Sequence, residues 1–397
     1  MAAGGSGTRP WATTARGAGQ PRPGDARAGG RAGQDPAGAG SPAGDAAQRE
    51  RIGQDPGREG ATASRLADQA SLDLPAGAPG MAPREGILPD ALALVGGTPV
   101  VRLRHGPPAS AEVVCKLEWM NPGGSVKDRI ALGMVEAAER DGRLRPGDTI
   151  VEATSGNTGF GLAVVAAVRG YRLVLTMPDD MNMERRSLFS WYGVELILTP
   201  AIEGMSGAVY AAERVVRERG SFWPRQFENP HNPAAHLAAT GPELYAQCGG
   251  RIDALVAGVG TGGTLTGTAR FLRTRLPRLL VVAVEPARSA VLSGGRPGPH
   301  RLLGLGAGFV PGVLDRSLVD RVLACGDEDG FDAARELACS EGLLAGPSSG
   351  AAVWGALRVA AELGQGRRVA CILPDGGDRY ASMLPWALRH TEGGGTR

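Results

Sequence analysis

The chain contains the nonapeptide Asn121-Pro-Gly-Gly-Ser-Val-Lys-Asp-Arg129, in which a glycine turn leads into a helical pattern. The pattern predicts a helix over 125–141, because Ser125 is a favourable N-cap, Asp128 follows three positions later, and apolar residues then recur on one face. Lys127 lies in the first turn, where the helix dipole disfavours an ammonium group and lowers its pKa. Lys127 is therefore a candidate nucleophile, with a solvated lysine at a helix start as the alternative.

Lysine is rare in this chain, which uses arginine for nearly all of its cations. Only Lys116 and Lys127 are lysines among the 43 Lys and Arg residues. A lysine kept against such a bias is a candidate for chemistry that a guanidinium cannot perform, chiefly attack by a neutral amine. Lys116 falls in an apolar strand pattern, so we interpret it as a structural lysine whose amine reaches solvent.

A second loop, Thr154-Ser-Gly-Asn-Thr-Gly159, lies between a predicted strand at 149–152 and a predicted helix at 158–169. Hydroxyl and backbone N–H groups at a helix start form a seat for a carboxylate or a phosphate. Ordinary capping by serine or threonine explains the same residues. The loop alone leaves both interpretations open.

A third loop, Gly258-Val-Gly-Thr-Gly-Gly-Thr264, joins a predicted strand at 254–257 to a helical stretch at 265–275. Its four glycines let the backbone wrap closely around a phosphate. The loop also satisfies GxGxxG, and Glu285 ends the next strand, where a dinucleotide-binding fold keeps the acid that binds the ribose. A nicotinamide-dependent oxidoreductase is therefore an alternative, weakened by the late position of this loop and by the earlier anion seat.

Two further segments lie in the C-terminal part of the chain. Gly346-Pro-Ser-Ser-Gly-Ala-Ala352 leads into a predicted helix at 351–363, and in isolation it is an ordinary N-cap. Leu373-Pro-Asp-Gly-Gly-Asp-Arg-Tyr380 leaves a predicted strand at 368–373, so it would lie at the ligand-binding edge of a parallel sheet.

Short apolar runs alternate with helical periods from about residue 87 onward, a pattern typical of βα units around a mostly parallel sheet. The predicted strands are 100–103, 112–117, 149–152, 172–176, 195–198, 254–257, 280–284 and 368–373. The predicted fold class is therefore α/β.

The first part of the chain has a different composition. Residues 1–86 are dominated by Gly, Ala, Pro, Arg, Asp and Gln, and Trp11 is the only aromatic residue before Trp119. Such a stretch cannot bury enough apolar surface to offset its conformational entropy, so we predict a disordered low-complexity arm. The chain has 397 residues, 42% of them hydrophobic, which is enough for two or three domains.

Charge and residue patterning exclude several classes of partner. The formal net charge is +2, which argues against nucleic-acid binding through bulk charge. No apolar run approaches the roughly 18 residues of a membrane helix, and no secretory signal is present, so we expect a cytoplasmic protein. The five cysteines and five histidines are scattered, without a CxxC pair, so neither a metal site nor a disulfide framework is expected.

Taken in order, four of these motifs resemble the cysteine synthase and cystathionine β-synthase family of pyridoxal-phosphate enzymes: Asn-Pro-Gly-Gly-Ser-Val-Lys-Asp-Arg, Thr-Ser-Gly-Asn-Thr-Gly, Gly-Val-Gly-Thr-Gly-Gly-Thr and Ser-Ser-Gly-Ala-Ala. The resemblance covers about residues 87–385. It implies the tryptophan-synthase-β type fold, pyridoxal-phosphate fold type II, with two αβα domains. By this resemblance 87–120 and 232–390 form a large cofactor-binding domain, and 121–231 form a small mobile domain that closes over the substrate.

The resemblance also implies a role for each matched residue. Lys127 would form the internal aldimine with pyridoxal 5'-phosphate and later transfer the proton of the substrate α-carbon. The other cofactor-binding residues would be Asn157 at the ring hydroxyl, Ser348 at the pyridine nitrogen, and the phosphate loop of Gly260, Thr261, Gly262, Gly263 and Thr264. The substrate carboxylate would be bound by Thr154, Ser155, Thr158 and Gln226.

A neutral serine at the pyridine nitrogen leaves the cofactor ring less electron-poor than a carboxylate would, which favours loss of a group from the β-carbon. The implied reaction is β-replacement through an aminoacrylate. The segments 177–186, 297–300 and 304–311 look most like O-acetylserine sulfhydrylase, which makes cysteine from O-acetylserine and sulfide.

Several alternatives stay open at this point. A cystathionine β-synthase-like or specialised β-replacement would use serine or O-phosphoserine, or another nucleophile. A catalytically silent regulator of the same fold is a further possibility, against which intact Lys127, Asn157 and Ser348 argue. The family also implies a homodimer and a serine acetyltransferase partner. Trp191-Tyr-Gly-Val194 stands where smaller residues are expected, and it could alter a partner surface or a helix packing.

Overall fold

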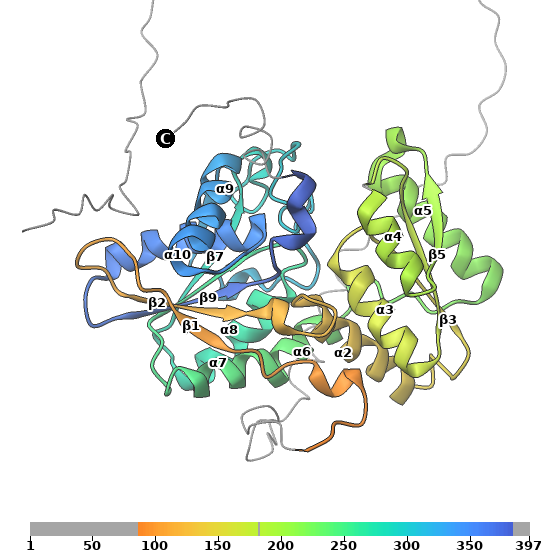
Figure 1. Ribbon diagram of the computed structural model, residues 1–397, viewed down its shortest axis with the longest axis horizontal. Helices are drawn as coiled ribbons and strands as arrows, with labels where there is room; N and C mark the ends of the chain where they lie inside the picture. Colours follow the sequence, from red (N-terminus) through yellow and green to blue (C-terminus); the bar gives the residue numbers. More distant parts are fainter. Residues whose placement is uncertain (1–85, 182, 384–397) are drawn as a thin grey trace, which may run out of the picture. The chain divides into compact units, whose positions relative to one another are not determined.

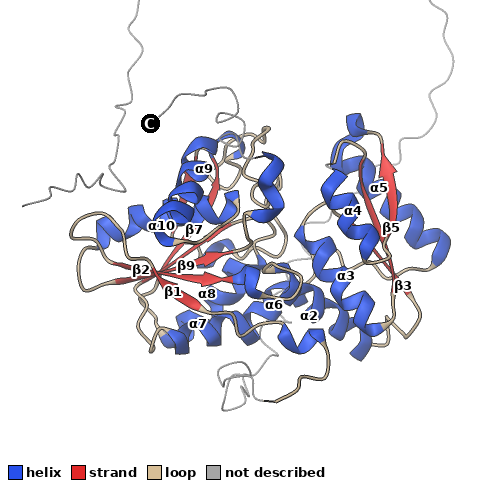
Figure 2. Cartoon of the chain, viewed as in Figure 1, coloured by secondary structure: helices blue, strands red, loops and turns tan. Residues whose placement is uncertain are grey.

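The computed structural model describes residues 86–181 and 183–383, which contain two β-sheets with helices packed against them (Figures 1 and 2). The predicted arm at 1–86 lies outside the described residues except for Gly86, and so does the end of the predicted large domain beyond 383. All described residues belong to a single compact unit.

The larger sheet has six strands in the order β1-β2-β9-β6-β7-β8. All of its neighbouring strands are parallel except the β1–β2 pair, which forms an antiparallel edge. The strands are β1 (Val100–Arg102), β2 (Glu112–Leu117), β6 (Ala254–Gly258), β7 (Leu280–Pro286), β8 (Arg321–Cys325) and β9 (Arg368–Leu373). The central strands are nearly continuous apolar runs, as expected for a parallel sheet that is covered on both faces.

Four helices and a short helical turn cover this sheet: α6 (His231–Ala235), α7 (Gly241–Gln247), α8 (Gly263–Arg275), α9 (Asp327–Glu336) and α10 (Pro347–Leu363). Helix α10 packs with one face of the sheet in a core that includes Val256 and Val369. Helices α7 and α8 pack on the other face with Leu255 and Ala370. Neighbouring residues of one strand thus point to opposite faces. Helices lie on both sides of the sheet (Figure 1).

The smaller sheet has three parallel strands in the order β3-β4-β5, namely β3 (Thr149–Ala153), β4 (Arg172–Pro178) and β5 (Glu195–Thr199). One core, on the side of α2 (Lys127–Arg140) and α3 (Asn157–Arg169), includes Leu175 and Leu196. The other core, on the side of α5 (Gly204–Arg219), includes Val174 and receives Ile197. A short helix, α4 (Met183–Trp191), connects β4 to β5.

The predicted α/β fold with mostly parallel sheets is confirmed, and so are all eight predicted strands, within two residues at their ends. One strand, β8, was missed because its side chains are mostly half-exposed and no strong apolar run marks it. The predicted helix at 125–141 begins two residues late, at Lys127, although Ser125 Oγ does accept a hydrogen bond from the Lys127 amide. The predicted domain boundaries stay a prediction.

The interpretation of Lys116 as a lysine that reaches solvent is wrong. Its side chain is 0% exposed, and its amine forms an ion pair of 2.8 Å with Glu243 and donates to the Thr98 carbonyl at 3.0 Å. An apolar strand pattern does not distinguish a lysine that extends to the surface from one that finds an acidic partner inside the protein.

Candidate active site

The predicted cofactor residues converge at the carboxyl-terminal ends of β6 and β9 and at the starts of α2, α3, α8 and α10. One small cavity is lined by seven of them: Lys127, Asn157, Gly260, Thr261, Gly262, Thr264 and Ser348. The eighth, Gly263, begins α8 directly behind this wall. Segments that are far apart in sequence meet here because parallel strands place all of their carboxyl ends at one edge of the sheet.

The Lys127 side chain is partly buried and lines this cavity. Burial lowers the pKa of its amine, and the carboxylate of Asp375 opposes that effect. The direction agrees with the prediction from the sequence, but burial is the main cause here. A lysine with a lowered pKa is more often neutral, as a nucleophilic amine must be.

Asp375, which follows β9, lies in the segment that the sequence placed at the ligand-binding edge, although no role was predicted for this residue. It accepts hydrogen bonds from Asn157 Nδ2 at 2.7 Å, from Ser348 Oγ at 3.4 Å and from the Tyr380 hydroxyl. Burial raises its pKa, while the hydrogen bonds from Tyr380 and Asn157 lower it. The signal that points to it is its position two residues after the end of the central strand β9, at the ligand-binding edge.

Arg379 also joins the parts of the site. It donates to Asn157 Oδ1 at 2.8 Å and to the Gly123 carbonyl, and its guanidinium lies 4.4 Å from the centroid of the Phe160 ring. Arg379 therefore links the turn before Lys127 to the first turn of α3. Sequence reasoning missed it because arginine is so frequent in this chain.

The glycines of the third loop are required by close contacts. A Cβ on Gly260 would lie 2.2 Å from the Gly304 carbonyl oxygen, and a Cβ on Gly263 would lie 1.8 Å from Asn232 Oδ1. Gly262 has φ +84°, in the left-handed region that favours glycine. With no side chains in the way, the backbone at the start of α8 can approach a phosphate directly, which fits a phosphate-bearing cofactor.

The four predicted substrate residues do not line that small cavity. Thr158 Oγ1 donates to Gln226 Oε1 at 2.5 Å, so the structure brings these two together although 68 residues separate them. Thr154 Oγ1 accepts from the Gly156 amide at 3.1 Å, and the Ser155 carbonyl accepts from Arg185 at 3.2 Å. The loop with Thr154 and Ser155 precedes α3, whose first residues include Asn157 and Thr158.

A buried carboxylate lies behind Gln226. Glu152 Oε2 is 3.4 Å from the backbone nitrogen of Gln226, and Glu152 Oε1 accepts a hydrogen bond from Trp223 Nε1 at 2.9 Å. Burial raises the pKa of Glu152 to about 7, against the hydrogen bonds from Trp223 and the backbone. Glu152 and Trp223 thus connect the segment that carries Gln226 to the end of β3.

The alternative of a nicotinamide enzyme loses its main support. Glu285 is buried and accepts from the Leu292 amide at 2.8 Å and from the Ser293 amide at 3.0 Å and hydroxyl at 2.6 Å. Its carboxylate therefore closes its own loop and is not presented to a ribose. The GxGxxG match reflects tight turns and close packing.

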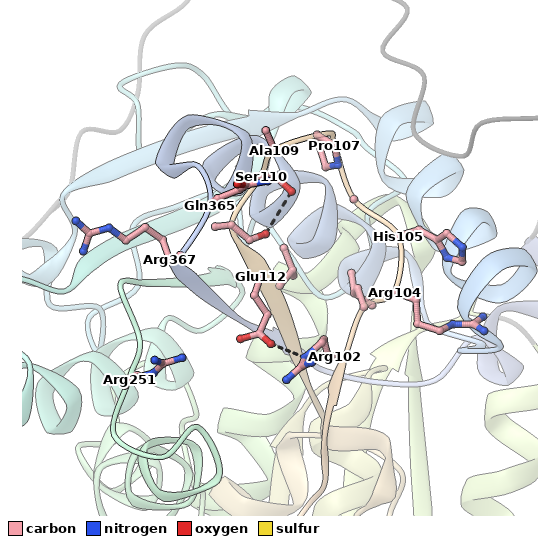
Figure 3. A pocket seen from close by; sticks show the side chains of 15 residues that line it. Arg102, Arg104, His105, Pro107, Ala109, Ser110, Glu112, Arg251, Gln365 and Arg367 are labelled. Atoms are coloured by element: carbon pink, nitrogen blue, oxygen red, sulfur yellow. Dashed lines mark hydrogen bonds and ion pairs between the residues drawn. The ribbon is translucent and has the colours of Figure 1, made fainter.

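A cavity at the opposite end of the six-stranded sheet has a different character (Figure 3). It has a volume of about 460 Å³ and is lined by residues that include Arg102, Glu112 and Arg367. Arg102 pairs with Glu112, and Arg367 pairs with Asp253 at 2.9 Å. None of the predicted site residues lines it, and it lies where β2 and β9 begin.

The donor set suits pyridoxal phosphate. A partly buried lysine with a lowered pKa stands next to a glycine loop that has no room for side chains, with a neutral serine and an asparagine at the same wall. Within the described residues no group of three or more His, Cys, Asp and Glu side chains could hold a metal ion, and none of their helices is long and apolar enough to cross a membrane.

The chain belongs to the pyridoxal-phosphate dependent enzyme family, whose model matches residues 91–375. It is 54% identical over 291 residues to a cysteine synthase from Staphylococcus aureus, covering 73% of this chain and 94% of that protein. The identity of this relative refines the family match to the cysteine synthase type.

Solved structures give the same picture. A cysteine synthase from Entamoeba histolytica is 39% identical with a TM-score of 0.74, over 79% of this chain and 94% of that one. An O-ureido-L-serine synthase is 44% identical with a TM-score of 0.74, over 78% of this chain and 98% of that one. A hydrogen sulfide-producing enzyme from Fusobacterium nucleatum is 41% identical with a TM-score of 0.71, over 74% of this chain and 100% of that one.

Proposed function

We propose that the protein is a pyridoxal-phosphate dependent cysteine synthase that makes L-cysteine from O-acetyl-L-serine and sulfide. The observation that carries the proposal is the buried Lys127 amine at the wall of a cavity that also includes the glycine loop and Ser348. The 54% identity to a cysteine synthase supports the choice of substrates.

The proposed roles follow from the chemistry of each residue. Gly260, Thr261, Gly262, Gly263 and Thr264 bind the cofactor phosphate. Ser348 and Asn157 bind the ring without placing a full charge on it. When bound, pyridoxal phosphate supplies an electron sink for the substrate α-carbon. Lys127 holds the cofactor and then, as a free amine, takes the proton from the α-carbon.

Thr154, Ser155, Thr158 and Gln226 are proposed to bind the substrate carboxylate, in keeping with the contact between Thr158 and Gln226. Closure of a small domain at 121–231 over the rest of the protein would exclude water from the reacting atoms. We further propose, from the family resemblance, a cytoplasmic homodimer that has serine acetyltransferase as a partner.

The test is an absorbance spectrum of the purified full chain, taken before and after O-acetylserine is added without sulfide. We expect a yellow band that moves to longer wavelength with O-acetylserine and returns when sulfide is supplied, together with cysteine formation. A protein without a yellow band would contradict the cofactor assignment. A yellow band that ignores O-acetylserine would exclude this donor and leave serine, O-phosphoserine or a specialised amino acid.

The same assay separates a second candidate function. One structural relative is an O-ureido-L-serine synthase at 44% identity, so the acceptor in this fold is not always sulfide. Acceptors other than sulfide, including an amine and homocysteine, would be compared at equal concentration. A preference of tenfold or more for one of them over sulfide would replace cysteine synthesis as the main activity.

A further inference from the structure

The glycine loop before α8 is packed against one short segment of the chain. Helix α8, which begins at Gly263, lies beside α6 and the turn of π-helix that follows α6 at His236–Thr240 (Figure 1). The contact is close, since a Cβ on Gly267 would lie 2.1 Å from the Pro233 carbonyl oxygen and 2.7 Å from His236 Cβ. Single turns of π-helix occur often at functional sites.

Two buried side chains of this segment contact the two hydroxyl groups of the loop. Asn232 and His236 are 0% and 1% exposed. Asn232 Nδ2 lies 3.1 Å from Thr261 Oγ1, and His236 Nε2 lies 3.2 Å from Thr264 Oγ1. Both threonines line the small cavity that also contains Lys127, whereas Asn232 and His236 do not. The two threonines are therefore held by side chains that lie outside the cavity.

The contacts of Asn232 fix the direction of one hydrogen bond. Its Nδ2 atom also lies 2.7 Å from the Gln226 carbonyl oxygen, which can only accept, so the amide NH2 group faces both atoms and donates to Thr261 Oγ1. Thr261 Oγ1 accepts a second hydrogen bond from the Gly263 amide at 3.4 Å. With both lone pairs of this oxygen used, the Thr261 hydroxyl can enter a further contact only as a donor.

The contact of His236 is open to two directions. Burial, with the charge of Arg129 as a smaller cause, lowers the pKa of His236 to about 3, so the imidazole is neutral and has one N–H group. Its Nδ1 atom lies 2.8 Å from Thr240 Oγ1. The Nδ1–H tautomer donates to Thr240 and accepts the hydrogen of Thr264. The Nε2–H tautomer donates to Thr264 and accepts from Thr240.

A phosphate selects between these two directions. Thr264 belongs to the loop proposed to bind the cofactor phosphate, and the oxygens of an ionised phosphate accept hydrogen bonds. In the Nδ1–H tautomer the hydrogen of Thr264 is bound to His236, so Thr264 would turn a lone pair toward the phosphate. In the Nε2–H tautomer Thr264 accepts from His236 and donates its own hydrogen to the phosphate, which is a strong hydrogen bond because its acceptor is charged.

We propose that Asn232 and His236 are positioning residues for the cofactor phosphate, which bind Thr261 and Thr264 so that each threonine donates its hydroxyl hydrogen to the phosphate. His236 is accordingly the Nε2–H tautomer. The proposal rests on the proposed function, because it takes the two threonines as phosphate ligands. It adds the source of their orientation.

The first test measures the tautomer of His236 in the unmodified protein. The full chain is produced with histidine that contains nitrogen-15 at Nε2 only, and its nitrogen-15 NMR spectrum is recorded with pyridoxal phosphate bound. The signal of His236 is the one that is lost in the His236→Gln chain. We expect the chemical shift of a protonated nitrogen. The shift of an unprotonated nitrogen would overturn the proposal, while the yellow absorbance of the same sample would leave the cofactor assignment intact.

The second test uses two replacements that each keep one half of the imidazole contacts. The amide of glutamine reaches the position of Nε2, and the shorter amide of asparagine reaches that of Nδ1. The Kd of pyridoxal phosphate is measured by equilibrium dialysis of the full chain. We expect His236→Asn to raise this Kd about tenfold, the effect of one hydrogen bond to a charged group, and His236→Gln to raise it less than about threefold.

His231→Asn is the matched control for these variants, because His231 begins the same segment and is half-buried. It should leave the Kd of pyridoxal phosphate unchanged. If His236→Gln weakens cofactor binding as much as His236→Asn does, the contact with Thr264 is not the cause and the proposal is wrong. Circular dichroism of each variant verifies that the fold is intact.

Double variants separate this proposal from the proposed function. Thr261→Val and Thr264→Val should each raise the Kd of pyridoxal phosphate. Asn232→Ala should raise it further only while Thr261 is present, and His236→Asn only while Thr264 is present, because each acts through its threonine. Effects that are the same with and without the threonine would overturn the proposal and leave the proposed function standing. Threonine variants that bind the cofactor normally would contradict both the proposal and the phosphate-binding roles on which it rests.

Discussion

Helix α2 takes part in two buried clusters of charged groups that differ in how completely their charges are paired. In the first, Arg129 binds Glu118 at 2.6 Å and Glu243 at 2.8 Å, and Lys116 binds Glu243 at 2.8 Å. Two cations thus meet two anions. In the second, the Lys127 amine has only Asp375 as an opposite charge among the causes that shift its pKa.

The pKa values show what this difference does. Burial by itself would raise the pKa of Glu118, but the charge and hydrogen bonds of Arg129, the charge of Lys116 and the hydrogen bond from Thr98 together outweigh it and lower the value to about 2. In the second cluster burial prevails, since it lowers the pKa of Lys127 and raises that of Asp375. Burial lowers the pKa of Lys116 in the first cluster as well, so the two clusters differ in their carboxylates: the pKa values of Glu118 and Glu243 are lowered, whereas that of Asp375 is raised. The carboxylates of the first cluster therefore stay charged, whereas the second cluster favours neutral groups that can exchange a proton.

The most direct way to break this comparison is Lys127→Ala. We expect turnover to fall by about a thousandfold or more, because the residue that binds the cofactor and moves the proton is gone. The yellow absorbance of the bound cofactor should disappear while the fold, measured by circular dichroism, is retained. A variant that keeps both colour and turnover would show that another group does this work.

The matching change in the paired cluster is Lys116→Met, which keeps most of the length of the side chain and removes its charge. It leaves the Glu243 carboxylate with one buried cation in place of two, so we expect a loss of about 3 to 5 kcal/mol in the free energy of unfolding, measured by urea titration. Colour and turnover of the folded protein should persist. Loss of colour without loss of stability would mean that the two lysines have exchanged roles.

Asp128 sharpens the comparison, because it directly follows Lys127 in the sequence and is itself poorly paired. Burial raises its pKa from 3.8 to about 7, and its Oδ1 atom has no hydrogen-bond partner. A carboxyl group whose pKa is raised on folding does not reduce the free energy of unfolding below pH 4, where it is protonated in both states. It reduces that free energy as the pH rises toward 7 and above.

The Asp128→Asn variant should therefore be more stable than the unmodified chain at pH 8. Its advantage should shrink by about 2 to 3 kcal/mol between pH 8 and pH 5, as the unmodified carboxyl becomes protonated. Urea unfolding at the two pH values measures this. Part of the decline with pH should remain, since the pKa of Glu152 is also raised to about 7. An advantage that does not depend on pH would contradict the assignment.

The smallest expected effect concerns a single hydrogen bond near the proposed substrate site. Trp223→Phe removes the indole N–H that Glu152 accepts at 2.9 Å, and Glu152 in turn contacts the segment of Gln226. We expect the KM for O-acetylserine to rise about fivefold, equivalent to about 1 kcal/mol, with kcat and cofactor absorbance nearly unchanged.

Trp354→Phe is the matched control for that variant, because the indole nitrogen of Trp354 is buried without a hydrogen-bond partner. It should leave the KM for O-acetylserine as it is. If both tryptophan variants raise this KM equally, the effect comes from ring packing and the hydrogen bond to Glu152 does not position Gln226.

The sequence predicted the sheets well because parallel strands buried on both faces leave strong apolar runs, as in β6 and β9. It also predicted most of the residues around Lys127, because glycines and hydroxyl residues at helix starts have recognisable patterns. It could not predict the partners of Lys116 or the hydrogen-bond partners of Asp375. Both depend on contacts between segments that only the fold brings together, and neither aspartate nor an apolar strand has a local signature for such contacts.

The pairing of β2 with β9 sets an order for synthesis of the protein. Arg368 of β9 contacts Glu112 of β2 across 256 residues, and β9 also pairs with β6 at the centre of the six-stranded sheet. The three-stranded sheet uses only residues 149–199 and has its partners close by in the chain. During synthesis on the ribosome the three-stranded sheet can therefore form while β2, whose partner β9 has not yet been made, has an exposed apolar edge. Strand β2 can pair with β9 only after residues 368–373 have emerged from the ribosome. We therefore expect chaperone binding or aggregation to begin at this strand.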